Sequence, residues 1–528
     1  MSSYFPKLSN GVNFLSETET HPRKFLMIGT CQLMPIHGAL LQLGHSADHL
    51  LWASHSHSEI PAVDSANQYD ANIISFTLRH VFYQAVLDLY PDIPEQIIEI
   101  EPLWVRALSE GLIEDFFDAC RRIVRSLVLR TQEVVGQRPT FFVTFLEPRR
   151  NFMGNLFPRY SLENISYFVQ RLNEYIEKLI RRMPNCYLFD LNEVFSEHGR
   201  IFNQDDYTLQ VAHASFIHDY EGDLNAAPTR MTALTKMSEM YNSREKLQQL
   251  TQSIAQRLVD NVKVALEPLQ IKLIICDLDD TLWSGISGEK EQMTWNEIGT
   301  WPLGLAEALL IYKARGGMLA ICSKNEYEPT VEKFKQAFKD GLRIEDFASV
   351  KINYESKAEN IRRILSEVNI LPQNALFIDD NPREVDEVKK TFPEMHILNT
   401  EPYDWRRKIL FSPLTQVPAI TNEARLRTQS IQAKIERDGT RSGASREEWL
   451  ASLNIEQRYV VVDTPAHENY ARAFELVNKT NQFNTNGERW SDDEMRHFLS
   501  SGGRIFCTFL NSAVTKSVFS RVCQRLQG

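Results

Sequence analysis

The sequence predicts an α/β protein built on parallel sheets, and two observations indicate it. The first is a series of short apolar runs that each end on polar residues, at 273–276, 317–322 and 375–378. Runs of this kind are typical of strands buried on both faces of a sheet. The second is an apolar repeat at helical spacing over residues 168–179, between two further runs of strand length. Alternation of strands with helices favours a parallel sheet.

Length and composition predict several domains and exclude some functions. The 528 residues, 43% of them hydrophobic, exceed the usual single-domain range. We expect three parts: residues 1–266, 267–425 and 426–528. No apolar run approaches the roughly 20 residues that span a bilayer, so no membrane association is expected. A net charge of −11 argues against nucleic acid as the main partner.

The cysteines indicate a cytoplasmic protein. Seven cysteines are scattered along the chain, and no two have the spacing of a CxxC pair. An odd number of scattered cysteines, with no secretory leader, fits reduced thiols better than disulfides or a zinc site.

The N-terminal part begins with a predicted strand, tight turn and helix at residues 24–32. Further strands are expected at 71–76, 140–145 and 186–190. A long polar helical stretch over about 230–266 is expected to link this part to the next.

The turn Gly29-Thr30-Cys31 resembles the start of SGNH-hydrolase-like domains, with Cys31 near the position of their usual serine nucleophile. Two interpretations stay open. The domain is either a degenerate scaffold or docking surface, which we favour, or an acyl-transfer site in which Cys31 pairs with His213.

The strongest chemical signal is the pair Asp277 and Asp279, directly after the apolar run 273–276. Residues two apart in an extended chain point the same way, so both carboxylates can face one small volume beyond the strand. Ligands bind there in open α/β sheets. Two adjacent carboxylates repel unless a cation offsets them, which favours a hard divalent ion such as Mg²⁺ with one carboxylate left as a nucleophile. The alternative is an acidic turn after a buried strand.

Three later segments carry matching polar residues in order. Ser323 ends the second apolar run, Lys357 begins a predicted helix, and Asp379 and Asp380 follow the third run. Together with Asp-x-Asp-x-Thr at 277–281, this order resembles the four motifs of the haloacid dehalogenase (HAD) superfamily, so the middle part is expected to be a Rossmann-like HAD core.

That resemblance implies a role for each residue. Asp277 would attack phosphorus to give an aspartyl-phosphate, and Asp279 would protonate the leaving oxygen and later activate the acceptor. Ser323 would hydrogen-bond the phosphoryl oxygens, and Lys357 would offset charge on the nucleophile and the phosphate. Mg²⁺ would be held by the Asp277 side chain, the Asp279 carbonyl, and either Asp379 or Asp380.

The sequence around these motifs, and about 20–510 as a whole, resembles the FkbH-like family of HAD proteins. The resemblance implies removal of phosphate from 1,3-bisphosphoglycerate and loading of the glyceryl group, as a thioester, onto an acyl carrier protein in polyketide biosynthesis. A simple phosphatase on a small phosphorylated metabolite is the alternative, and a non-enzymatic scaffold is less favoured. Asp280 stands where that family often carries asparagine, a mild departure.

A thioester needs a thiol, and Cys322 precedes the phosphate-binding Ser323. We weigh Cys322 as an acyl acceptor against a packed strand residue, which is favoured because cysteine is commonly buried. Cys276 is expected in the core.

The C-terminal part has predicted strands at 459–462 and 505–510, and residues 475–484 resemble the early part of a GNAT-like tail. No further strands are expected after residue 510. We therefore predict a partial α+β domain without acetyl-CoA activity.

Overall fold

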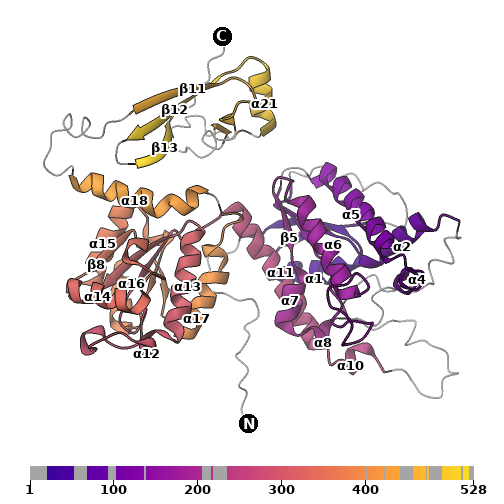
Figure 1. The fold of residues 1–528 in the computed structure, drawn as a ribbon, viewed down its shortest axis with the longest axis horizontal. Helices are drawn as coiled ribbons and strands as arrows, with labels where there is room; N and C mark the ends of the chain where they lie inside the picture. The colour runs from indigo at the N-terminus through magenta and orange to yellow at the C-terminus, as the bar shows by residue number, and fades with distance from the viewer. Residues whose placement is uncertain are drawn as a thin grey trace. The chain divides into compact units, whose positions relative to one another are not determined.

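The structure is a computed structural model that describes residues 21–52, 68–92, 103–135, 138–204, 216–217, 235–399, 401–420, 422–440, 456–470, 473–474, 490, 492–512 and 515–521. The chain divides into two compact units, whose helices and strands are labelled in Figure 1. The first comprises Met1–Gln270 with Phe411–Pro418, and the second comprises Ile271–Leu410 with Ala419–Gly528.

A parallel sheet of five strands forms the first unit, in the order β2-β1-β3-β4-β5. The strands are β1 (Lys24–Gly29), β2 (Ser46–Leu51), β3 (Ala71–Ser75), β4 (Thr140–Val143) and β5 (Cys186–Phe189). The four strands expected from the sequence are therefore present. The fifth, β2, was not expected; it lies at the edge of the sheet, and its residues are exposed or half-buried, so it lacks an apolar run.

Helices cover both faces of this sheet, which gives three layers. One apolar cluster packs helices α2 (Leu78–Leu89), α4 (Leu103–Ser109), α5 (Ile113–Val135) and α6 (Ile165–Ile180) against Leu26, Ile74 and Phe142. A second packs α1 (Met34–Gln42), α7 (Leu191–His198) and α11 (Arg244–Leu266) against Phe25, Met27 and Ile73. The shorter elements are η1 (Cys31–Leu33), α8 (Arg200–Asn203), α10 (Met237–Met240) and η6 (Pro413–Thr415).

The expected polar linker is a packed helix. Leu250, Ile254, Leu258 and Val262 of α11 are fully buried against the first sheet. The apolar side chains repeat at helical spacing, so this helix belongs to the core of the first unit, with its polar face outward.

The second unit contains another parallel sheet of five strands, in the order β10-β9-β6-β7-β8. Its strands are β6 (Leu273–Cys276), β7 (Met318–Ser323), β8 (Ser349–Ile352), β9 (Ala375–Ile378) and β10 (His396–Leu398). Numbered within the sheet, this is the Rossmann-like order 3-2-1-4-5 read from the other edge. The predicted α/β class with a Rossmann-like parallel core is confirmed. The chain reverses direction across the sheet between β6 and β9, where such folds bind ligands.

The connections of the second unit are helical. They comprise η3 (Ser287–Glu289), α12 (Trp295–Ile298), α13 (Trp301–Ala314), α14 (Tyr327–Phe338), η4 (Ile344–Asp346), α15 (Lys357–Val368), η5 (Pro372–Asn374), α16 (Pro382–Thr391), α17 (Pro402–Phe411) and α18 (Asn422–Thr440). Helices α15 and α16 pack against one face of the sheet, on Leu273, Ile275 and Phe377.

An antiparallel sheet of three strands follows, made of β11 (Glu456–Val462), β12 (Ile505–Ser512) and β13 (Thr515–Arg521). Helix α21 (Asp492–Ser500) packs with it through a small apolar cluster of its own. The expectation of no strand after residue 510 was wrong, because β13 pairs with β12. The GNAT-like segment 475–484 lies outside the described residues.

Over the part of the chain that the structure describes, we find no helix whose length and apolar character would let it cross a bilayer.

Candidate active site

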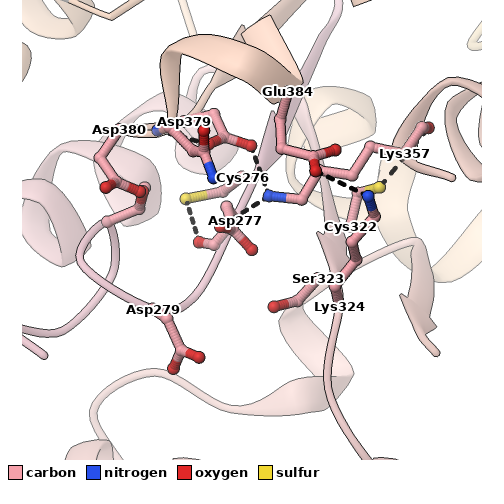
Figure 2. Close-up of polar contacts among 12 residues, drawn as sticks. Cys276, Asp277, Asp279, Cys322, Ser323, Lys324, Lys357, Asp379, Asp380 and Glu384 are labelled. Atoms are coloured by element: carbon pink, nitrogen blue, oxygen red, sulfur yellow. Dashed lines mark hydrogen bonds and ion pairs between the residues drawn. The ribbon is translucent and has the colours of Figure 1, made fainter. Parts of the chain in front are cut away.

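The carboxylates of the site follow two neighbouring strands at the reversal point of the second sheet. Cys276 pairs with Ile378 in the register of β6 and β9, so the next residues, Asp277 and Asp379, leave the sheet side by side. Asp380 follows in the same turn. Figure 2 shows the three carboxylates close together at this edge.

Lys357 reaches the same point from a helix. It is the first residue of α15, whose N-cap Ser356 accepts a hydrogen bond from the Glu359 N–H. Its Nζ lies 2.7 Å from Oδ2 of Asp277 and 2.5 Å from Oδ2 of Asp379. The three side chains are buried, with 3% of Lys357, 9% of Asp277 and none of Asp379 exposed. The predicted helix start is confirmed.

Burial and mutual repulsion shift the pKa values of this group. Burial raises the pKa of Asp379, and the charge of Asp277 raises it further, to about 7 despite the ammonium of Lys357. Burial and the same neighbouring charge also raise the pKa of Asp380. Burial alone would lower the pKa of Lys357, but Asp277 and Asp379 outweigh it and raise that pKa. The ammonium is therefore held in its charged form.

The donor set fits a hard divalent cation. Asp277, Asp379 and Asp380 each offer a carboxylate oxygen, and these oxygens lie within 4.8 Å of one another. Oδ1 of Asp277 is buried and accepts no hydrogen bond within the described structure. Buried polar atoms normally have a partner, and the three acidic side chains outnumber the ammonium of Lys357, so the group is negative once they ionise. Oxygen donors and a net charge of this sign suit Mg²⁺ or a similar ion.

Asp279 faces away from the carboxylate group, toward the segment that follows β6 (Figure 2). Its Oδ1 accepts hydrogen bonds from Trp283 Nε1 at 2.8 Å and from the Ser287 N–H at 2.9 Å. Its Oδ2 accepts from Asn325 Nδ2 at 3.1 Å. Three donors thus hold the Asp279 side chain in place, while the predicted metal contact of Asp279 involves its carbonyl.

The segment from Ser284 to Glu289 is tied to the site by hydrogen bonds. Asp280 has a φ of +50°, a conformation that aspartate tolerates better than most residues. Its carboxylate accepts a hydrogen bond from the Gly285 N–H at 2.6 Å. Lys333 of α14 donates a hydrogen bond to the Ser287 carbonyl. Ser287 is therefore held through its carbonyl by Lys333 and through its N–H by Asp279.

Ser323 ends β7 with its hydroxyl directed into the site (Figure 2). The residue is 1% exposed, and its Oγ accepts a hydrogen bond from Asn325 Nδ2 at 3.1 Å. Asn325 therefore contacts both Ser323 and Asp279. The structure thus brings Asp277, Lys357, Asp379 and Asp380 together and places Ser323 and Asp279 beside them.

Cys322 is fully buried among the side chains that α15 covers. Its Sγ lies 3.8 Å from the Lys357 carbonyl oxygen, and burial raises the pKa of its thiol. This position favours the interpretation of Cys322 as a packed strand residue over that of an acyl acceptor. Cys276 is also fully buried, as expected. In the first unit, Cys31 is half-buried at the start of η1, and its predicted partner His213 lies outside the described residues.

Sequence reasoning did not assign a role to Trp283, Asn325 or Lys324. Trp283 and Asn325 hold Asp279, and Lys324 Nζ lies 2.6 Å from Oε1 of Glu384 on α16. Both Lys324 and Asn325 directly follow Ser323, so proximity to that motif was the available signal.

Comparison with known proteins adds little. No family model and no curated protein matches the chain. Among solved structures, the N-terminal part of the protein BF1531 from Bacteroides fragilis, described as containing a phosphatase domain complexed with Mg, aligns with a TM-score of 0.47 and 19% identity. The alignment covers 77% of this chain and 96% of that chain. A likeness of this level carries no argument about activity.

Proposed function

We propose that the second unit is a Mg²⁺-dependent phosphotransferase of the HAD type, with Asp277 as its nucleophile. The observation that carries the proposal is the state of the Asp277 carboxylate. One oxygen is fixed by Lys357, and the other is buried without a hydrogen-bond partner in the described structure, beside two further carboxylates. The carboxylate is thus held through one oxygen, and its other oxygen accepts no hydrogen bond in the described structure. At the reversal point of a parallel sheet, such an oxygen suits in-line attack on a bound phosphoryl group.

Asp277, Asp379 and Asp380 would hold the metal, which supplies positive charge that neutralises the phosphoryl oxygens and the carboxylates. Phosphoryl transfer depends mainly on positioning and on charge stabilisation.

Each remaining residue has a defined task. Asp277 forms an aspartyl-phosphate as the leaving oxygen departs. Asp279 gives that oxygen a proton and then takes one from the incoming acceptor. Lys357 balances charge on Asp277 and on the phosphoryl group, and Ser323 donates its hydroxyl hydrogen to a phosphoryl oxygen.

For the substrate, we propose 1,3-bisphosphoglycerate. The thiol of an acyl carrier protein attacks its acyl carbon and displaces the acyl-bound phosphate, and Asp277 takes the remaining ester phosphate, which leaves a glyceryl thioester on the carrier. Support for this finer proposal comes from the resemblance of the motifs to the FkbH-like family. A simple phosphatase on a small phosphorylated metabolite is the second candidate, and it is favoured by the burial of the two thiols next to the site, Cys276 and Cys322.

One experiment separates the two candidates. The chain is incubated with Mg²⁺, 1,3-bisphosphoglycerate and a holo carrier protein; phosphate release is measured, and the intact mass of the carrier is determined. A glyceryl adduct that is lost in Asp277→Asn supports transfer, whereas phosphate release with unmodified carriers supports the phosphatase. Asp386→Asn is the control, because Asp386 is an exposed residue on nearby α16. Activity that survives Asp277→Asn would refute both candidates.

A further inference from the structure

Asn325 connects two groups that the proposed reaction uses at different moments. Its Nδ2 lies 3.1 Å from Oδ2 of Asp279 and 3.1 Å from Oγ of Ser323. Asn325 is half-buried two residues after Ser323, in the turn before α14. One amide group therefore joins the proton-transfer carboxylate to the phosphate-binding hydroxyl.

The amide turns its NH₂ group toward both neighbours, because Nδ2 donates to Oδ2 of Asp279 and to Oγ of Ser323. The NH₂ group has two hydrogens, one for Asp279 and one for Ser323. Because Ser323 Oγ then acts as an acceptor toward Asn325, its own hydrogen remains to be donated to a phosphoryl oxygen.

The other donors to Asp279 hold its opposite oxygen. Trp283 Nε1 and the Ser287 N–H both bond Oδ1, and both belong to the segment that follows β6. Trp283 is fully buried and packs edge-on against Phe334, so it is a rigid donor. Asn325 is thus the donor that joins Asp279 to the loop after β7, from which the phosphate-binding hydroxyl comes.

We propose that Asn325 is a positioning residue that fixes the Asp279 carboxylate and the Ser323 hydroxyl relative to each other. Proton transfer by Asp279 and binding of the phosphoryl oxygens by Ser323 then act on the same phosphoryl group. This inference rests on the proposed function, which it deepens. Misplacement of a catalytic group by a fraction of an ångström lowers the rate without removing any reacting atom.

The test compares Asn325→Ala with wild type on two probes, 4-nitrophenyl phosphate and β-glycerophosphate. The nitrophenolate leaves without a proton, whereas the alkoxide needs one from Asp279. We expect kcat/KM to fall at least about tenfold further for the alkyl phosphate than for the aryl phosphate, since general-acid catalysis contributes about 10²–10⁴-fold. A residue that only stabilised the fold would lower both values equally.

A second readout does not depend on turnover. Inorganic phosphate binding in the presence of Mg²⁺, measured by titration calorimetry, should weaken in Asn325→Ala, because the Ser323 hydroxyl loses its orientation. Asn325→Asp, which keeps the side-chain shape and removes both donors, should weaken it as well, and it serves if the alanine variant does not fold.

The control is Gln432→Ala, which removes another amide of the second unit. Gln432 Nε2 donates to the carbonyls of Glu345 and Phe347 at 2.9 and 3.0 Å, both outside the site. This variant should leave phosphate binding and the ratio of the two kcat/KM values at the wild-type level.

The outcomes distinguish the two claims. Equal losses on both probes, with phosphate binding unchanged, would overturn the role of Asn325 and leave the proposed function standing. If the wild type hydrolyses neither probe, the phosphotransferase proposal for such substrates fails, and phosphate binding decides the inference: weaker binding in the variants supports it, and equal or absent binding overturns it.

Discussion

Replacement of Lys357 by methionine removes the one ammonium that lies between Asp277 and Asp379. The side chain keeps its approximate length and loses its charge. In the native site, Nζ lies 2.7 Å from one carboxylate and 2.5 Å from the other, with 3% of the side chain exposed. Loss of one partner from a buried ion pair destabilises a fold by roughly 3–5 kcal/mol, because the remaining charge is left uncompensated.

The loss should depend on pH in a defined direction. The pKa of Asp379 is raised to about 7 in the folded chain, above the ordinary value of about 3.9. The folded state therefore binds more protons than the unfolded state between these values, and stability increases as the pH falls through that window. Without Lys357 the pKa of Asp379 rises further, so the variant gains more stability than wild type as the pH falls. The deficit of the variant should be smaller at pH 6 than at pH 8.

The assay is urea unfolding, followed by tryptophan fluorescence in metal-free buffer at both pH values. Lys351→Met is the matched control, because Lys351 pairs with Glu367 on the partly exposed edge of the same unit. A pair near the surface, open to solvent on one side, contributes about 0–1 kcal/mol. A deficit for Lys357→Met no larger than that of the control, or equal at pH 6 and pH 8, would refute the account of the buried charges.

Three further predictions concern the surroundings of the site. The Thr294 hydroxyl and N–H lower the pKa of Glu297 to about 2 in a capping box, so Glu297→Gln should destabilise the fold by about 1 kcal/mol at pH 7. This difference in stability, measured by urea unfolding, should disappear as the pH falls toward 2. A difference that stays constant with pH would contradict the prediction. Because Cys322 is buried and its thiol pKa is raised, the native chain should resist alkylation of this residue by iodoacetamide. The variant Cys322→Ala should still release phosphate. A folded variant that loses turnover would instead indicate a role for the thiol. Asp280 adopts a φ of +50°, which asparagine tolerates and valine does not. Asp280→Asn should therefore leave stability unchanged, whereas Asp280→Val should lower it by about 1–2 kcal/mol. An equal effect of the two substitutions in thermal unfolding would contradict this prediction.

Strand ends were the part of the site that the sequence could predict. The runs before Asp277 and Asp379 are fully apolar, so the position of the first polar residue marks the end of each strand. Lys357 was placed at a helix start, and Ser323 at the end of β7, for similar reasons. Parallel strands bring their carboxyl ends to one edge of a sheet, so convergence of these residues followed from the predicted fold class.

Other features depend on packing that no local pattern records. Polar residues interrupt the apolar ones in the edge strand β2, and β10 spans three residues, so neither produces a long apolar run. The role of α11 as a core helix depends on the sheet that it covers. The contacts of Asn325 join residues 46 and 2 positions away in the chain, and an asparagine in a turn is by itself unremarkable.

The central claim is that Asp277 becomes transiently phosphorylated. The most direct measurement is a rapid quench of the chain with Mg²⁺ and an acyl phosphate, reduction with borohydride, and peptide mass spectrometry. Reduction converts an aspartyl-phosphate to homoserine, and we predict this change at Asp277, with none in Asp277→Asn. Homoserine at another aspartate, or phosphate release from a chain in which no aspartate is ever modified, would contradict the account.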